Sequence, residues 1–258
     1  MLSDAALAGT SPPSTEYDAL LVLQGNPSHV LLGTEHGLFE TTDGGHAWQS
    51  AGLAGEPVTS LTRVGSTLLA GGRGLLAQSS NGGRTWRPLH PKGLPDEDIA
   101  ALAATVGPRP SVYVVLGSGG LFRSTDDLRT FALVSWEVGP RIRAMATTPT
   151  RILAGDVVSG VYVSSDGQVW LHAAGGMVMA LAVSTDDPRR VLAASYGIAL
   201  SRDGGLRWTL VKRSRAMFGS VAWAPGHPSL AYAIGDDRSF WRSTDGGRRW
   251  VDVGSRSR

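Results

Sequence analysis

The chain of 258 residues contains no cysteine. It therefore has no disulfide bond and no thiolate that could bind a metal or carry redox chemistry. The first residues lack the basic start and the long apolar stretch of a secretory signal, so we expect a cytoplasmic protein. The sequence also has no run of about 18 apolar residues, so no membrane-spanning helix and no membrane partner are expected.

Charge is scarce as well. Only 18% of the residues are charged, the net charge is +2, and Lys92 and Lys212 are the only lysines among 24 basic residues. The calculated pI of 9.2 reflects this small surplus of arginine and not a basic stripe, which is the mark of nucleic-acid binders. We therefore expect no nucleic-acid partner.

Glycine is what the chain has in excess, with 34 of 258 residues, about 13% against a typical share of about 7%. The glycines follow no Gly-X-Y period, which excludes collagen, and the hydrophobic fraction of 42% is too high for a disordered chain. Many of the glycines belong instead to an internal repeat.

The repeat begins with Ser or Thr, continues with Asp or Asn and then Gly, and ends on an aromatic residue. Its six copies are residues 41–48, 79–86, 124–131, 164–170, 201–208 and 243–250. Five of the eight tryptophans close a copy, and Phe131 closes the third. A period near 40 residues excludes heptads and indicates either propeller blades or arrays of helical pairs.

The sequence before each copy decides between these two architectures. Two short apolar runs bounded by Gly or polar residues precede it, which is typical of strands. No segment of helix length keeps a 3.6-residue period without Gly or Pro. We therefore predict four strands per unit, with the repeat turning the third into the fourth. In the second unit we expect them at 58–64, 67–70, 75–79 and 85–89.

The residue types of the repeat suit a tight turn. Glycine adopts positive φ without penalty, and an Asp or Asn side chain accepts hydrogen bonds from backbone N–H groups just downstream. The closing Trp offers a flat apolar surface that we expect to pack against the next sheet. The third copy has Asp127 and Leu128 in place of the two glycines, and the fourth is one residue short before Trp170. We expect less regular turns in those two blades.

The pattern Ser/Thr-x-Asp-x-Gly-x-x-Trp resembles the Asp-box, or BNR repeat, of sialidases, sortilin-type propellers and photosystem II assembly propellers. The resemblance extends from about residue 17 to residue 253. It implies that the Asp residues of the repeats are structural and lie on the face away from a sialidase active site. Together with the copy number, it predicts an all-β fold: a six-bladed β-propeller of four-stranded antiparallel blades, with an Asp-box turn between the third and fourth strands.

We predict one domain over residues 17–254. Its blades are expected at about 17–54, 55–92, 93–138, 139–174, 175–212 and 213–254. No half-blade remains at either end, so the ring should close without exchange of a strand. Residues 1–16 are expected to form a flexible arm or, alternatively, a fifth strand outside a terminal blade, and residues 255–258 form a tail.

Function is expected in the loops that face away from the repeats, because loops on a rigid scaffold carry most recognition residues. We predict a non-catalytic, monomeric platform that binds a protein or peptide partner through these loops and a central pocket, without metal or cofactor. The candidate binding residues are Glu35, His36, Arg73, Arg141, Arg143, Asp156, Tyr196, Arg215, Asp236, Asp237 and Arg238. Trp136, Trp223 and Trp241 are either further anchors or packing between blades.

The alternative is a glycoside hydrolase of sialidase type or a carbohydrate-binding propeller. In sialidases a Tyr is the nucleophile, a role open to Tyr196, and three Arg hold the substrate carboxylate. The candidates for that grip are Arg73, Arg141, Arg143 and Arg215. The first blade contains no Arg, however, so the Arg-Ile-Pro-type motif that opens sialidase domains is missing. The six histidines show no zinc-site spacing, and no Gly-x-Ser-x-Gly elbow is present.

Overall fold

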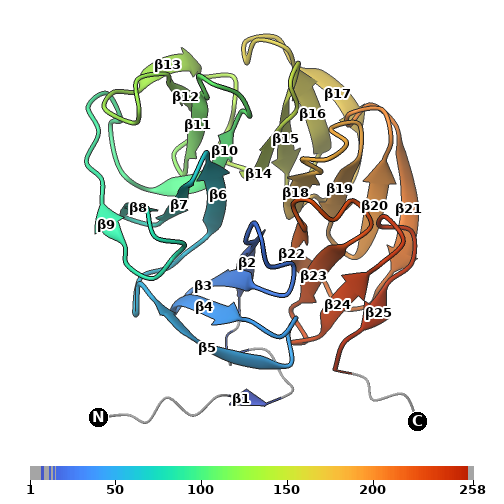
Figure 1. Ribbon diagram of the computed structural model, residues 1–258. Helices are drawn as coiled ribbons and strands as arrows, with labels where there is room; N and C mark the ends of the chain where they lie inside the picture. The colour runs from blue at the N-terminus through green and yellow to red at the C-terminus, as the bar shows by residue number, and fades with distance from the viewer. Residues whose placement is uncertain (1–6, 9–11, 13, 15, 255–258) are drawn as a thin grey trace.

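The computed structural model describes residues 7–8, 12, 14 and 16–254. All regular structure in this part of the chain is β-strand, arranged as six sheets around a central axis (Figure 1). The predicted six-bladed β-propeller is therefore confirmed. Within the described residues, no helix is long and apolar enough to cross a membrane.

Each blade contains four antiparallel strands in chain order, and the first strand of each lies innermost. The first three blades comprise β2 (Tyr17–Val22), β3 (Val30–Thr34), β4 (Gly37–Thr41) and β5 (Ala47–Gly52); β6 (Ser60–Val64), β7 (Thr67–Gly72), β8 (Leu75–Ser79) and β9 (Arg87–Pro88); and β10 (Ile99–Ala104), β11 (Val112–Leu116), β12 (Leu121–Ser124) and β13 (Ala132–Ser135). The last three comprise β14 (Ile142–Thr147), β15 (Ile152–Asp156), β16 (Gly160–Ser164) and β17 (Leu171–Ala174); β18 (Ala180–Val183), β19 (Val191–Ala194), β20 (Gly197–Ser201) and β21 (Trp208–Arg213); and β22 (Phe218–Trp223), β23 (Ala231–Gly235), β24 (Phe240–Ser243) and β25 (Val251–Asp252).

The ring closes between the last blade and the first without strand exchange, as the sequence indicates. Strand β22 packs against β2, and the Leu20 N–H donates to the Ser220 hydroxyl at 2.9 Å. One short strand, β1 (Leu7–Ala8), pairs antiparallel with β5 and adds a fifth strand to the first sheet, which agrees with the alternative stated for this segment. Most of the predicted arm, and the tail over 255–258, lie outside the described residues.

The six repeats form the turns between third and fourth strands. In the first, the Thr41 hydroxyl donates to Asp43 Oδ1 (2.7 Å) and accepts from the Gly45 N–H (3.0 Å). Asp43 Oδ1 also accepts from the amides of His46 (2.9 Å) and Ala47 (3.0 Å). The fifth and sixth turns repeat all four bonds. These side chains thus satisfy backbone donors that the tight turn leaves unpaired.

The same hydrogen bonds lower the pKa values of the turn carboxylates. The Thr130 hydroxyl and amide lower the pKa of Asp126 to about 2. For Asp43, desolvation acts in the raising direction, but the bonds from Thr41 and the two amides outweigh it and the pKa is lowered. A lowered pKa means that ionised Asp stabilises the fold above its unfolded pKa, and that this contribution is lost as the pH falls through the folded pKa.

The aromatic residue of each repeat packs against the preceding blade and not the following one. Trp48 meets Phe240 of the last blade edge to face, with ring centroids 5.3 Å apart, and Trp86 packs among residues of the first blade such as Leu31. Four of the closing tryptophans also donate their indole N–H to a glycine carbonyl of their own turn, at 2.9–3.1 Å: Trp86, Trp170, Trp208 and Trp250. Each repeat therefore attaches its blade to the blade before it.

The two atypical repeats behave differently from one another. Asp127 (φ 58°) and Leu128 (φ 66°) keep the left-handed conformation that the glycines adopt in the other turns. The Leu128 amide makes no bond to the Ser124 hydroxyl, although the other five turns have the equivalent bond, so the third turn keeps its backbone shape but is less regular in its hydrogen bonds. The fourth turn is less regular, as expected. It has only one left-handed residue, Gly167 (φ 82°), whose amide donates to the Ser164 hydroxyl three residues back (2.8 Å) instead of four.

The third turn gives a first prediction. Asp127→Gly should raise the free energy of unfolding by up to about 1 kcal/mol, because a non-glycine residue costs roughly 1–2 kcal/mol in the left-handed region and glycine's larger unfolded-state entropy offsets part of that gain. Asp127 is exposed, so little contact is lost. Urea denaturation would measure the change, with Arg129→Gly as a destabilised control. A less stable Asp127→Gly protein would contradict the prediction.

Candidate functional site

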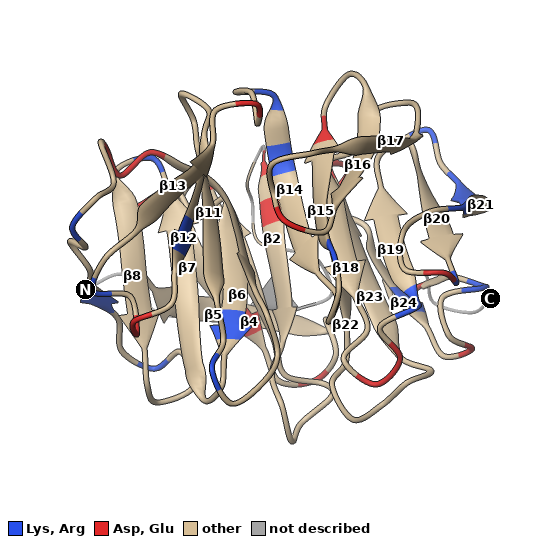
Figure 2. Ribbon diagram, turned by 90° about the horizontal axis from the view of Figure 1, so that it is seen from above, with Lys and Arg blue, Asp and Glu red and all other residues tan. Residues whose placement is uncertain are grey.

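The two faces of the ring differ. We call the face that carries the six repeats, and the connections between first and second strands, the turn face. The Gly44 N–H donates to the Ser28 carbonyl (3.0 Å), which places a repeat directly against such a connection. The opposite side, with the connections between second and third strands and between blades, is the rim face. Charged residues gather mainly in the loops of both faces (Figure 2).

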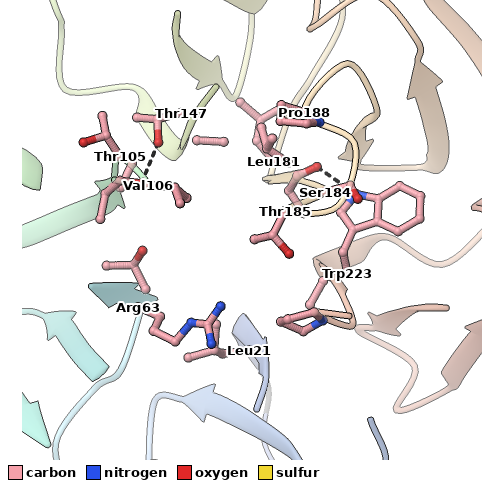
Figure 3. Close-up of a pocket in the computed structure, with 18 of the residues that line it drawn as sticks. Leu21, Arg63, Thr105, Val106, Thr147, Leu181, Ser184, Thr185, Pro188 and Trp223 are labelled. Atoms are coloured by element: carbon pink, nitrogen blue, oxygen red, sulfur yellow. Dashed lines mark hydrogen bonds between the residues drawn. The ribbon is translucent and has the colours of Figure 1, made fainter. Parts of the chain in front are cut away.

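A cavity of about 600 Å³ occupies the axis of the ring on the turn face. Its wall consists of the last residues of the six first strands and the connections that follow them. Each first strand contributes one residue at the same level: Val22, Arg63, Ala104, Thr147, Val183 and Trp223. The lining is therefore mostly apolar, with a few hydroxyl groups (Figure 3).

Among the described residues of this lining, Arg63 is the only one with an ionisable side chain. It reaches into the cavity (Figure 3), donates to the side-chain oxygen of Gln24, and forms no ion pair with any described residue. Desolvation lowers the pKa of its guanidinium, yet arginine stays protonated in proteins. The cavity thus holds one positive charge that no carboxylate of the described chain compensates.

Trp223 forms the wall on the side of the last blade. It is 6% exposed, and its indole N–H donates to the Ala182 carbonyl of the neighbouring blade at 3.1 Å. The Arg190 guanidinium lies 5.0 Å from the centre of the Trp223 ring. Trp223 therefore packs between blades, as one interpretation of the sequence held, and also lines the cavity.

The other two tryptophans outside the repeats lie away from the cavity. Trp241 is covered by the Lys212 ammonium, 4.0 Å from its ring centroid, and meets Phe218 edge to face. Trp136 is 62% exposed and touches Phe122 with ring centroids 5.7 Å apart. Of the three, Trp136 is the one that remains accessible as an anchor.

A second, smaller cavity of about 60 Å³ lies at the rim end of the axis. It shares with the large cavity a ring of aliphatic side chains, one from each first strand: Leu20, Leu61, Leu102, Met145, Leu181 and Val221. Asp18 and Arg143 also line it. Both occupy the position where the pairing of first and second strands shifts register, and they come from the first and fourth blades, which lie opposite in the ring (Figure 1).

Asp18 is the most perturbed acid of the described chain. Desolvation, with the charges of Glu16 and Glu35, raises its pKa to about 7 despite the attraction of Arg143. Its Oδ2 atom is buried and has no hydrogen-bond partner. Protonated and ionised forms of Asp18 therefore coexist near neutral pH.

The predicted binding residues lie on the rim face, and most of them hold their own loops. Asp156 accepts from the amides of Val158 (2.7 Å) and Ser159 (2.9 Å) and from Arg141 Nε (3.3 Å). Glu35 and His36 pair with each other at 3.4 Å. Asp236 accepts from the Met217 amide (3.2 Å), and Asp237 from the Ser239 amide (3.1 Å). Arg238 interacts with Tyr17. Among the predicted residues, only Arg143 lines one of the two cavities, namely the smaller one.

The remaining predicted residues are spread around the ring. Arg73 belongs to the second blade and Tyr196 to the fifth, on opposite sides of the axis (Figure 1). Tyr196 is 58% exposed, and its hydroxyl has no hydrogen bond to a described residue. Arg215 is exposed on the connection to the last blade. Arg73 therefore lies away from Tyr196, whereas the loop that carries Arg215 adjoins it, because the Ser214 N–H donates to the Tyr196 carbonyl at 3.3 Å. The described residues include no group of three His, Asp or Glu suited to a metal ion.

The sequence predicts a central pocket, but neither the contribution of Arg63 nor the position of the large cavity on the face of the repeats. A signal was present, because Arg63 is the one charged residue among the six that occupy its level in the first strands. The resemblance, however, points to the opposite face of the ring. The large cavity lies on the same face as the repeats.

Fold and cavity together define a class of protein: a six-bladed β-propeller with a central cavity. No protein-family profile matches the sequence, and no curated protein is significantly similar to it.

Solved structures match the fold. YCF48 from Cyanidioschyzon merolae is 16% identical with a TM-score of 0.59, over 96% of this chain and 88% of that chain. YCF48 bound to D1 peptide is 20% identical with a TM-score of 0.59, over 98% and 85%. The GH74 xyloglucanase from Xanthomonas campestris is 16% identical with a TM-score of 0.63, over 97% of this chain but 47% of the enzyme. At these identities the likeness shows the fold alone.

Proposed function

We propose that this protein is a binding propeller that takes a segment of a protein or peptide partner into the large cavity on its turn face. The cavity itself carries the proposal. Its volume of about 600 Å³ falls within the range of about 300–1,000 Å³ that ligand pockets show. Its lining offers apolar surface, hydroxyl groups and one cation, which suits recognition of a chain segment.

Two further observations support this role. One structural neighbour, YCF48, has been solved with a D1 peptide bound, so a related ring can hold a peptide. The hydrogen bonds of the turns are those expected for Asp-box repeats, which we propose these are.

Filling the cavity tests the proposal. Thr62 lines it from β6, is half-buried, and its side chain makes no hydrogen bond with the described chain, so Thr62→Trp should obstruct the cavity without removing a bond. Peptides that bind the parent protein can be selected from a display library. These peptides are expected to bind Thr62→Trp at least about tenfold more weakly than the parent, a loss of about 1.4 kcal/mol. Fluorescence polarisation would measure the affinities.

Arg215→Ala is the matched control on the rim face, since this exposed side chain lies far from the cavity lining. Its affinity for the same peptides should match that of the parent. The proposal fails if the library yields no binder. It also fails if the selected peptides bind Thr62→Trp as tightly as the parent and lose affinity only for Arg215→Ala.

A further inference from the structure

We propose that the large cavity recognises the free C-terminal carboxylate of an apolar peptide segment, with Arg63 as the residue that binds the carboxylate. This inference rests on the proposed peptide-binding function and specifies the chemistry of the ligand. It begins from the unmatched charge of Arg63, which lies among apolar and hydroxyl-bearing neighbours.

The carboxylates nearest in sequence to the cavity wall are already engaged elsewhere. Asp186 accepts from the Gly226 amide at 3.1 Å, and Asp187 binds Arg189 (3.1 Å) and Arg190 (3.5 Å). Arg63 is partly buried among the residues of the cavity lining, and a carboxylate is the group that arginine binds with two parallel hydrogen bonds. A ligand carboxylate therefore supplies what the cavity lacks.

The rest of the lining selects what the carboxylate is attached to. The Thr147 hydroxyl donates to the Ala104 carbonyl (2.6 Å), and the Thr105 hydroxyl accepts from the Ser111 amide (2.8 Å). Aliphatic surface predominates, and Val106 at the cavity wall is 83% exposed. Such a lining gains free energy by covering apolar side chains.

The shape of the cavity favours a chain end over an internal segment. The ring of six aliphatic side chains bounds the large cavity on the side of the small one. A chain terminus can enter such a space directly, whereas an internal segment must enter and leave through the same opening. A single cation also matches a monoanion better than a phosphate with nearly two charges.

The test uses N-acetylated hexapeptides whose last three positions vary among Ala, Val, Leu and Ile, each prepared as a free acid and as a C-terminal amide. We expect the best free acids to bind the parent at least about tenfold more tightly than their amides. Arg63→Gln should remove this preference, and Arg63→Lys should keep part of it. The comparison of acid and amide on the parent protein does not depend on the folding of any variant.

The outcomes separate this inference from the proposed function. If acids and amides bind equally and Thr62→Trp weakens both, the cavity binds peptides but not through a terminal carboxylate. A preference for the acid that persists in Arg63→Gln would also overturn the inference. Octanoate serves as a further probe, and binding of octanoate through Arg63 without binding of any peptide acid would make the ligand a small fatty acid and contradict both proposals.

Discussion

Gly45→Ala is expected to lower the free energy of unfolding by about 3 kcal/mol. Alanine is strained in the left-handed backbone conformation, and its methyl group would overpack the contact with Phe240. Gly45 has a φ of 101°, and a Cβ atom there would lie 2.2 Å from Cδ1 of Phe240. The Phe240 ring has little room to move, since it stacks on Tyr232 and meets Trp48, both at 5.3 Å. Urea denaturation followed by circular dichroism would measure the loss.

The preceding glycine provides the control. Gly44 also has a positive φ of 75°, but a Cβ atom there would approach the Tyr232 hydroxyl no closer than 3.5 Å, an ordinary contact. Gly44→Ala should therefore cost only about 1 kcal/mol, from the backbone conformation alone. Equal losses in the two variants would show that contact with the last blade does not constrain the turn.

Asp18→Asn is expected to flatten the dependence of the free energy of unfolding on pH between about 4 and 7. At pH 8 the variant should be more stable than the parent by up to about 4 kcal/mol. The folded pKa of Asp18 is about 7, above the unfolded value of about 3.9. Below about pH 4 the carboxyl is protonated in both states and carries no penalty. As the pH rises, the unfolded state releases the proton first, so the parent loses stability until the folded group ionises too.

Chemical denaturation at several pH values would measure this difference. Asp127→Asn, at an exposed Asp, should leave the slope unchanged, and comparison with the parent removes the contributions of the histidines. Parallel pH profiles for the parent and Asp18→Asn would show that Asp18 is ionised in the folded protein at neutral pH.

The fold was predictable because its signals are local and repeated. A hydroxyl residue, an Asp or Asn and, in five of the six copies, a glycine within five residues specify the turn, as Thr41, Asp43 and Gly45 show. Six copies at a period near 40 specify the blades. The direction of packing was not predictable. Which neighbour Trp48 meets depends on how consecutive sheets are arranged, and no single repeat contains that information.

The site was harder to predict for a different physical reason. Val22 and Trp223 share one cavity although about 200 residues separate them in the chain, and each first strand supplies a single residue at that level. No contiguous pattern marks such a site. Asp18 was missed for a related reason, since its burial depends on the convergence of six strands at the axis. Arg143 was singled out from its loop, but not as a neighbour of Asp18.

The third turn bears on how far such sequences can diverge. Asp127 and Leu128 keep a backbone conformation that favours glycine, so the adjoining strands and the neighbouring blades impose the conformation where the local sequence does not. A ring of six equivalent units thereby tolerates defects in one unit, because the other five maintain the shape. Sequence can therefore vary from blade to blade without loss of the fold, and this chain matches the fold of solved structures with which it shares as little as 16% of its residues.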